Sequence, residues 1–192
     1  MRNLIADLFI SLDGFASGTN EEAYFGYDGP ELSSWIEKET NQLQVILMGR
    51  NTYVALAHFA AEATDPNSIR LRELPKLVFS NSLHEPLTWQ NTRVMAGDLA
   101  QQIRALKQQS GDPIRTFGSM QLVKGLVQLG LVDRLRLMVF PLILGVTGRE
   151  PIYTEFQRTA LHRVGTKVLD SRLVLLEYES QNSGDADKQN RT

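Results

Sequence analysis

The sequence predicts an α/β protein with a mostly parallel central sheet, helices on both faces and a C-terminal antiparallel hairpin. Short apolar runs alternate with longer segments whose apolar residues recur at helical spacing, which is the pattern of βαβ units. Three of the apolar runs lead directly into a polar turn containing glycine or serine. Only Asp170-Ser171 separates the last two strand-like segments, and a parallel crossover needs a far longer connection.

The predicted strands are short and rich in Val, Leu, Ile and Phe, with few residues that disfavour strands. They cover residues 4–10, 45–48, 76–79, 92–95, 114–117 and 134–140. In the last of them, Leu135, Leu137 and Val139 alternate onto one face. The hairpin comprises residues 160–169 and 172–179. We expect residues 11–18 and 141–151 to form loops, because both segments are rich in turn-forming residues.

Four helices are predicted between these strands. The first runs from Pro30 to Asn41, since proline suits the first helical position and Glu31 favours the first turn. The second follows Arg50, and we expect residues 64–68 to end it. The third and fourth cover residues 99–109 and 120–129, and Gly130 closes the fourth. The apolar positions of the first two helices are Leu32, Trp35, Ile36 and Leu43, then Tyr53, Val54, Leu56, Ala57 and Ala60.

Length and composition favour one domain followed by a short tail. The chain has 192 residues, of which 42% are hydrophobic, and this supplies a full core for a single domain. We expect that domain to span residues 1–179. Residues 180–192 contain no apolar residue larger than alanine, so we expect them to form a disordered polar tail.

Charge and residue types exclude several classes of function. The net charge is −2 with mixed signs, which disfavours nucleic acid and anionic lipid as partners. The absence of cysteine excludes disulfides, thiolate catalysis and cysteine-ligated metals. His58, His84 and His162 are isolated from other metal ligands, so no metal site is predicted. With no cysteine in the chain, we expect a cytoplasmic protein. No apolar run approaches the ~18 residues of a membrane span.

The segment Gly49-Arg50-Asn51-Thr52 directly follows an apolar strand and has the residue types of a phosphate site. Glycine permits a tight turn and close approach of a ligand, and a helix that starts near Asn51 points free N–H groups at an anion. Arg50 adds a guanidinium suited to a phosphate, and Thr52 adds a hydroxyl. The alternative is an ordinary strand-to-helix connection with a solvated arginine.

Two further strand ends carry similar turns, Ser80-Asn81-Ser82 and Gly118-Ser119-Met120-Gln121. In an open α/β sheet, ligands bind beyond the carboxyl ends of the strands, and all three turns fall at such ends. Together they offer hydroxyls, backbone donors and one strong cation, which suit a nucleotide with a pyrophosphate. The alternative is three ordinary capped turns. The chain contains neither a Gly-x-Gly-x-x-Gly motif nor a phosphate-binding loop with Gly-Lys-Ser/Thr.

Several short motifs in the same order resemble one known family. They are Ser11 to Gly14, Leu47 to Tyr53, Val78 to Leu83, Phe117 to Ser119, Leu129 to Leu135 and Phe140 to Gly145. In them the chain, from about Arg2 to Glu179, resembles the dihydrofolate reductase-like fold, and specifically the reductase domain of riboflavin-biosynthesis deaminase/reductases, the RibD C-terminal domain. The chain has neither the His-x-Glu motif nor the cysteine pair of the deaminase half, so the resemblance extends to the reductase step alone.

The resemblance implies an NADPH-dependent reductase with a three-layer fold, in a homodimer. Its substrate would be a small pterin-, folate- or ribosylaminopyrimidine-like molecule. By the motif matches, Arg50 would bind the 2′-phosphate of the cofactor. The other predicted cofactor contacts are Ser80, Asn81 and Ser82 beside Arg50; Gly49, Asn51 and Thr52 at the phosphates; Phe117, Gly118, Ser119, Met120 and Gln121 at the pyrophosphate; and Leu12, Asp13 and Gly14 at the nicotinamide.

The sequence does not assign a proton donor. Folate reductases use an acid on the first helix, and the counterpart position here is roughly Leu32. The nearest carboxylates, Glu31 and Asp28, are the candidates, although a solvated acid in the first turn of the helix is the alternative for Glu31. The missing donor motivates a second hypothesis, namely a non-catalytic dimeric nucleotide-binding or sensing module with the same fold.

Overall fold

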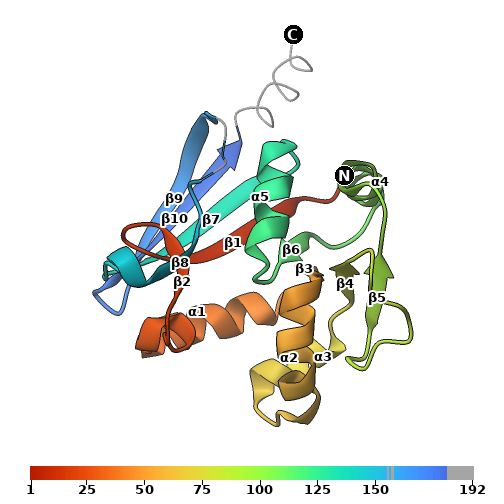
Figure 1. Cartoon of the computed structure of the whole chain (residues 1–192), viewed down its shortest axis with the longest axis horizontal. Helices are drawn as coiled ribbons and strands as arrows, with labels where there is room; N and C mark the ends of the chain where they lie inside the picture. Colours follow the sequence, from red (N-terminus) through yellow and green to blue (C-terminus); the bar gives the residue numbers. More distant parts are fainter. Residues whose placement is uncertain (155, 157, 181–192) are drawn as a thin grey trace.

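A central eight-stranded sheet organises the chain, in the order β5-β4-β3-β6-β1-β7-β10-β9 (Figure 1). The computed structural model describes residues 1–154, 156 and 158–180. The strands of this sheet are β1 Leu4–Ser11, β3 Val45–Gly49, β4 Lys76–Phe79, β5 Thr92–Met95, β6 Ile114–Thr116, β7 Arg134–Phe140, β9 Leu161–Leu169 and β10 Leu173–Ser180. The first six strands of this list pair in parallel, and β10 pairs antiparallel with both β7 and β9. The predicted fold class is confirmed.

The C-terminal hairpin turns at the predicted pair, Asp170 and Ser171. Both residues have a left-handed backbone, with φ of 51° and 54°, as in the two-residue turns whose twist matches that of paired strands. Strand β9 lies at the edge of the sheet, and most of its residues are exposed. Strand β7 is buried on both faces. Leu135, Leu137 and Val139 pack in one cluster, which agrees with their predicted position on one face.

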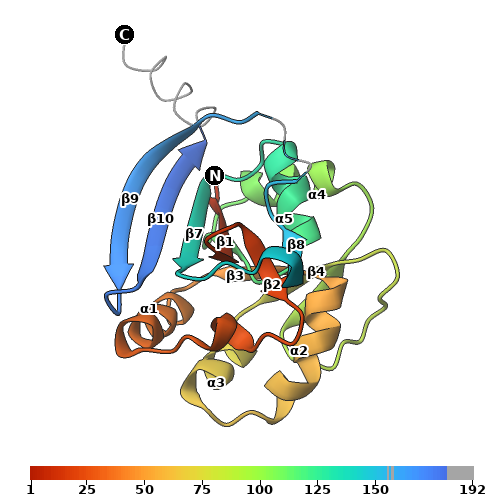
Figure 2. The same ribbon diagram turned by 60° about the vertical axis from the view of Figure 1, so that its left-hand side comes forward.

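Helices cover both faces of the sheet (Figures 1 and 2). They are α1 Pro30–Thr40, α2 Arg50–Glu62, α3 Pro66–Glu73, α4 Leu99–Gln108 and α5 Met120–Gln128. Alternate residues of β1 point to opposite faces. Leu8 packs in one cluster with Ile103 of α4 and Val123 of α5, whereas Phe9 packs beside Trp35 of α1. The helices α2 and α3 contact each other on the α1 side.

Helix α3 corrects the expectation that residues 64–68 only end the preceding helix. Pro66 stands at the first position of a new helix, and the carboxylate of Asp65 accepts the N–H of Ser68 at 3.0 Å. Proline here starts a helix because the first amide of a helix has no partner within it. Two predicted apolar positions are also wrong: Val54 is 54% exposed and Leu43, beyond the end of α1, is 67% exposed.

A small second sheet forms within the two expected loops. Strands β2 Phe15–Gly18 and β8 Gly148–Pro151 pair antiparallel, with Phe15 opposite Pro151. A Cβ added at Gly148 would lie 2.5 Å from the ring of Phe15, so only glycine allows this close approach. Two short 3-10 segments flank these strands, η1 Ala23–Gly26 and η2 Gly145–Thr147.

The expected polar tail lies mostly outside the described residues, which end at Ser180, the last residue of β10. Among the helices that the structure describes, none combines the length and the apolar character needed to cross a bilayer.

Candidate functional site

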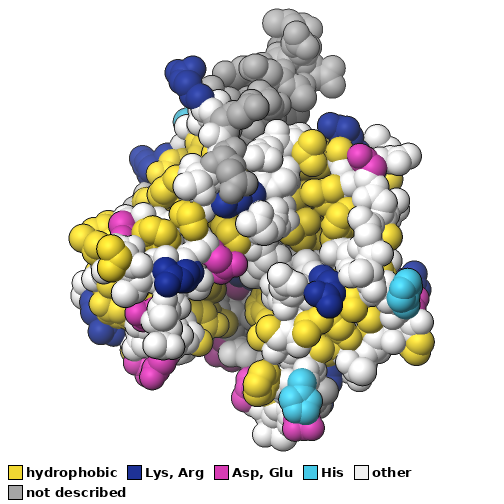
Figure 3. Space-filling model, viewed as in Figure 1, with side chains coloured by type: hydrophobic (Ala, Val, Ile, Leu, Met, Phe, Trp, Pro, Cys, Tyr) yellow, Lys and Arg dark blue, Asp and Glu magenta, His cyan; other side chains and the backbone are white. Residues whose placement is uncertain are grey.

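A cavity of about 770 Å³ lies toward the carboxyl ends of β1, β3 and β6. The face in Figure 3 is hollowed between the parts of the chain that carry α1 and α2, with hydrophobic side chains on both sides of the hollow. The cavity brings together nine of the predicted cofactor residues, which we call the phosphate end. They are Gly49, Arg50, Asn51, Thr52, Phe117, Gly118, Ser119, Met120 and Gln121.

Ser119 joins the first turns of α2 and α5 at this phosphate end. Its hydroxyl accepts the N–H of Gly49 at 2.7 Å and donates to the hydroxyl of Thr52 at 2.7 Å. Ser119 itself has a left-handed backbone, with φ of 64° and ψ of 60°. The neighbouring Gly118, with φ of 57°, is so close to Thr52 that an added Cβ would lie 3.1 Å from its methyl carbon. Two helices that start after different strands therefore begin side by side.

Among the residues that the structure describes, no side chain caps either helix. Gly49 precedes α2 and has no side chain, and the hydroxyl of Ser119 is engaged with Gly49 and Thr52 instead of its own helix. The first N–H groups of a helix have no partner within it and carry partial positive charge. Arg50 is exposed at the start of α2. Its guanidinium group makes no ion pair or hydrogen bond within the described part of the chain. These donors fit the phosphates of a dinucleotide.

The other predicted turn after a strand, Ser80-Asn81-Ser82, does not line the cavity. The hydroxyl of Ser80 accepts the N–H groups of Ser82 at 3.2 Å and Leu83 at 3.1 Å. The side-chain oxygen of Asn81 accepts the N–H of Gly97 at 2.8 Å. Both side chains therefore shape the connection after β4.

Leu12, Asp13 and Gly14 also lie outside the cavity lining. The carboxylate of Asp13 accepts the hydroxyl of Ser11 at 2.7 Å and the N–H groups of Leu144 at 3.1 Å and Gly145 at 2.8 Å. The hydrogen bond from Ser11, together with those from Gly145 and Leu144, lowers the pKa of Asp13 against a smaller effect of burial. Asp13 thus ties the end of β1 to the segment before β8.

Neither proposed acid, Glu31 nor Asp28, lines the cavity. The carboxylate of Asp170 accepts the N–H groups of Glu31 at 2.9 Å and Leu32 at 3.0 Å, and the carboxylate of Glu31 accepts the N–H of Asp170 in return. The two residues thus join the start of α1 to the hairpin turn. Asp28 accepts a hydrogen bond from Arg172 through its backbone carbonyl at 2.9 Å.

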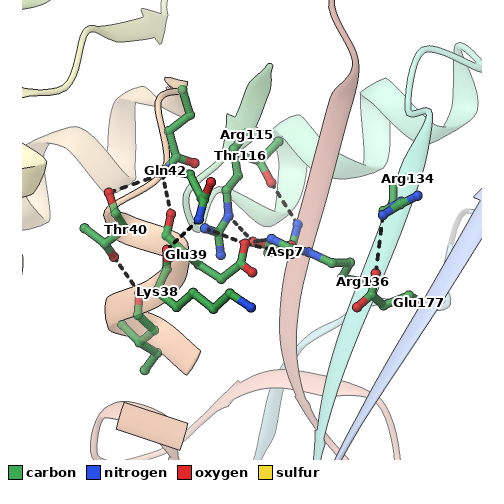
Figure 4. A network of polar contacts seen from close by, with 12 residues as sticks. Asp7, Lys38, Glu39, Thr40, Gln42, Arg115, Thr116, Arg134, Arg136 and Glu177 are labelled. Carbon is green, nitrogen blue, oxygen red and sulfur yellow. Dashed lines mark hydrogen bonds and ion pairs between the residues drawn. The ribbon is translucent and has the colours of Figure 1, made fainter. Parts of the chain in front are cut away.

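Four charged residues that are not among the predicted site residues form a network beside the cavity: Asp7, Glu39, Arg115 and Arg136 (Figure 4). The carboxylate of Asp7 accepts Nε of Arg136 at 2.6 Å and Nη2 of Arg136 at 2.9 Å, and it also accepts Nε of Arg115. Glu39 pairs with Arg136 at 2.8 Å and with Arg115 at 3.4 Å. We call this set the charge quartet; Asp7 and Arg115 line the cavity.

The quartet is balanced and mostly buried. Burial acts to lower the pKa of Arg136, but the hydrogen bonds and charges of Asp7 and Glu39 outweigh it and raise that pKa. Both guanidinium groups lie over the ring of Trp35, with centroid distances of 5.5 Å for Arg115 and 5.2 Å for Arg136. The sequence signals were single charges inside predicted strands. They do not reveal their partners, because Arg115 and Arg136 lie more than 100 residues from Asp7, in two other strands.

Aromatic side chains adjoin the quartet and line the cavity. The ring centroid of Phe9 lies 5.4 Å from that of Tyr24 and 6.1 Å from that of Trp35. Burial raises the pKa of the Tyr24 phenol, which keeps it protonated. We call one part of the cavity the aromatic end; it is lined by Phe9, Tyr24, Trp35 and Ile36. In the described residues, no group of three or more His, Asp or Glu side chains is placed to hold a metal ion.

The family model for the RibD C-terminal domain matches residues 2–175. The chain belongs to this family. The uncharacterized protein YyaP of Bacillus subtilis (strain 168) is 28% identical over 184 residues, which are 92% of this chain and 94% of YyaP. The predicted family is therefore confirmed from the sequence as a whole.

Solved structures show the same fold for this RibD C-terminal domain. A protein of Shewanella sp. PV-4 that is provisionally assigned to riboflavin biosynthesis matches with a TM-score of 0.71 at 18% identity, covering 93% of this chain and 99% of its own. Dihydrofolate reductase from Enterococcus faecalis, solved with NADP(H), matches with a TM-score of 0.63 at 16% identity, covering 93% and 96%. The dihydrofolate reductase-like fold is that of an oxidoreductase-type family.

Proposed function

We propose that this protein is an NADPH-dependent reductase that holds its cofactor by the phosphates at the starts of α2 and α5. The observation that carries this proposal is that two uncapped helix N-termini meet at one cavity with Arg50, whose side chain has no partner among the described residues. Membership of the RibD C-terminal domain family supports it, as does the similarity to a dihydrofolate reductase solved with NADP(H).

In this proposal, the phosphate end of the cavity binds the cofactor and the aromatic end binds the acceptor. Arg50 binds the 2′-phosphate through a charge-assisted hydrogen bond, and the first amides of α2 and α5 bind the pyrophosphate. A bound dihydronicotinamide supplies a hydride, which is chemistry of the cofactor. The aromatic end holds the acceptor, a small ring of the pterin, folate or ribosylaminopyrimidine type, and keeps water away from it.

Cofactor titration of the Arg50→Ala variant tests this proposal. A hydrogen bond to a charged group contributes ~1.5–3 kcal/mol, so Arg50→Ala should weaken NADPH binding by roughly ten- to a hundredfold. NADH lacks the 2′-phosphate, so its affinity should stay nearly unchanged. Arg104→Ala, at an exposed position of α4, is the matched control and should change neither affinity. Equal losses for both cofactors would exclude the 2′-phosphate assignment, and no NADPH binding by the wild type would exclude the function.

The alternative is a dimeric nucleotide-binding module without turnover. It is favoured by the contacts of the two carboxylates that line the described part of the cavity, because both are already paired with other side chains. Asp7 is held by two guanidinium groups, and Glu150 accepts the hydroxyl of Ser17 at 2.9 Å, so each is already engaged. NADPH oxidation is measured across pterins, quinones, aldehydes and pyrimidine ribosides. Tight cofactor binding with no oxidation by any of them supports the module and contradicts the reductase.

A further inference from the structure

We infer that the aromatic end of the cavity takes an uncharged planar ring and excludes rings that bring a phosphate, sulfonate or carboxylate into it. This inference rests on the proposed function, because it names the class of substrate for that same site. It also separates the acceptors named above, since a phosphorylated ribosylaminopyrimidine would carry its anionic group into the cavity and an unsubstituted heteroaromatic ring would not.

The charge quartet is the first reason. It holds two carboxylates against two guanidinium groups, so its formal charges cancel. Their side chains are 8% exposed for Asp7, 20% for Glu39, 13% for Arg115 and 7% for Arg136. Both oxygens of Asp7 accept hydrogen bonds, and Glu39 binds both guanidinium groups. An entering anion would have to displace one of these carboxylates from its arginine, and breaking a buried ion pair leaves an uncompensated charge.

The walls beside the quartet are the second reason. Phe9, Tyr24, Trp35 and Ile36 offer ring faces and edges on which a planar ligand packs well. Within the described part of the chain, the charged residues that line the cavity are Asp7, Arg50, Arg115 and Glu150. Of the two cations, Arg115 is committed to the quartet, and Arg50 begins α2 at the phosphate end, where the proposed function gives it to the cofactor. An anion at the aromatic end would lose its hydration without gaining a free cationic partner among the described residues.

A pair of probes that share one ring tests the inference. Equilibrium dialysis of the full chain measures the dissociation constants of 1,4-naphthoquinone and of 1,4-naphthoquinone-2-sulfonate. We expect the uncharged quinone to bind at least tenfold more tightly than the sulfonate. Equal or tighter binding of the sulfonate overturns the inference, and so does binding of neither probe. The Trp35→Leu variant locates the site, because it should weaken quinone binding at least fivefold; an unchanged constant would show that the quinone binds elsewhere.

Removing one carboxylate tests the role of the quartet. Glu39→Gln leaves one guanidinium charge unbalanced, so the affinity for the sulfonate should rise and the ratio between the two probes should shrink at least threefold. Glu37→Gln, at an exposed position of the same helix, is the matched control and should leave the ratio unchanged. An unchanged ratio in folded Glu39→Gln would overturn the role of charge balance. If that variant does not fold, the ratio in the wild type still decides the inference.

NADPH titration of the same preparation separates this inference from the proposed function. If NADPH binds and the sulfonate is preferred, the substrate class is wrong while the reductase proposal stands. If the quinone is preferred but NADPH does not bind, the cavity has the inferred selectivity and the reductase proposal is wrong.

Discussion

Replacing Ser119 by alanine should loosen the phosphate end of the cavity. The substitution removes the hydroxyl that accepts the N–H of Gly49 and donates to Thr52, both at 2.7 Å. An amide left without its acceptor costs ~1–3 kcal/mol when buried. Because Gly49 is only half-buried, we expect Ser119→Ala to lower the free energy of unfolding by about 2 kcal/mol.

Ser119→Gly removes the same hydroxyl but relieves the left-handed backbone, whose φ is 64°. That conformation costs roughly 1–2 kcal/mol for a residue with a side chain, and part of the gain is lost to the greater freedom of glycine in the unfolded chain. We therefore expect the glycine variant to be about 1 kcal/mol more stable than the alanine variant. Under the proposed function, both variants also bind NADPH more weakly than the wild type.

Urea unfolding of the wild type and both variants measures these differences, provided that the slopes of the transitions agree. If the alanine variant is as stable as the wild type, the hydroxyl does not join the two helices. If the glycine variant is the less stable of the two, the backbone of Ser119 is not strained, and the reasoning about this junction is wrong.

Two further predictions concern residues away from the cavity. Lys76 is buried, its ammonium donates to three carbonyls at the end of α3, and burial lowers its pKa from 10.5 to about 8. The unfolded chain therefore binds more protons between these values. Raising the pH from 8 to 10 should stabilise the wild type relative to Lys76→Met by roughly 2–3 kcal/mol, as measured by urea unfolding at each pH; a constant difference would contradict this. Asp170→Ala removes the acceptor for two N–H groups of α1 and should cost about 1 kcal/mol, seen as a lower Tm, whereas Ser171→Ala at the same turn should change Tm little.

The main strands were predictable because each is a short run rich in residues that favour strands and is followed by a turn, and this information is local. The elements that were not predicted depend on pairing with a distant part of the chain, or on a residue type that occurs at both ends of helices. Strand β2 has four residues and pairs with β8, at least 130 residues later in the chain. The sequence around Pro66 predicts the end of one helix, although proline equally starts another.

The same difference between local and distant information explains why the phosphate end was predicted and the quartet was not. Gly49 to Thr52 and Gly118 to Gln121 were predicted because glycines, hydroxyls and a cation follow strands directly in the sequence. The quartet could not be predicted, because its members belong to four elements and the sequence around the single carboxylate in β1 does not indicate its partners. Ser80 and Asn81 are residue types found in ligand sites, but their side chains accept backbone N–H groups and so stabilise the connection after β4.

The strand order also sets when the cavity can form during synthesis. Strand β6 lies between β1 and β3, and its Ile114 pairs with both Leu4 and Val45. Until the ribosome has released β6, the earlier strands β1 and β3 keep open edges that can pair with other chains. Closing such distant contacts is slow. A ligand of the phosphate end would bind only after this insertion, and so would stabilise the finished sheet without assisting its assembly.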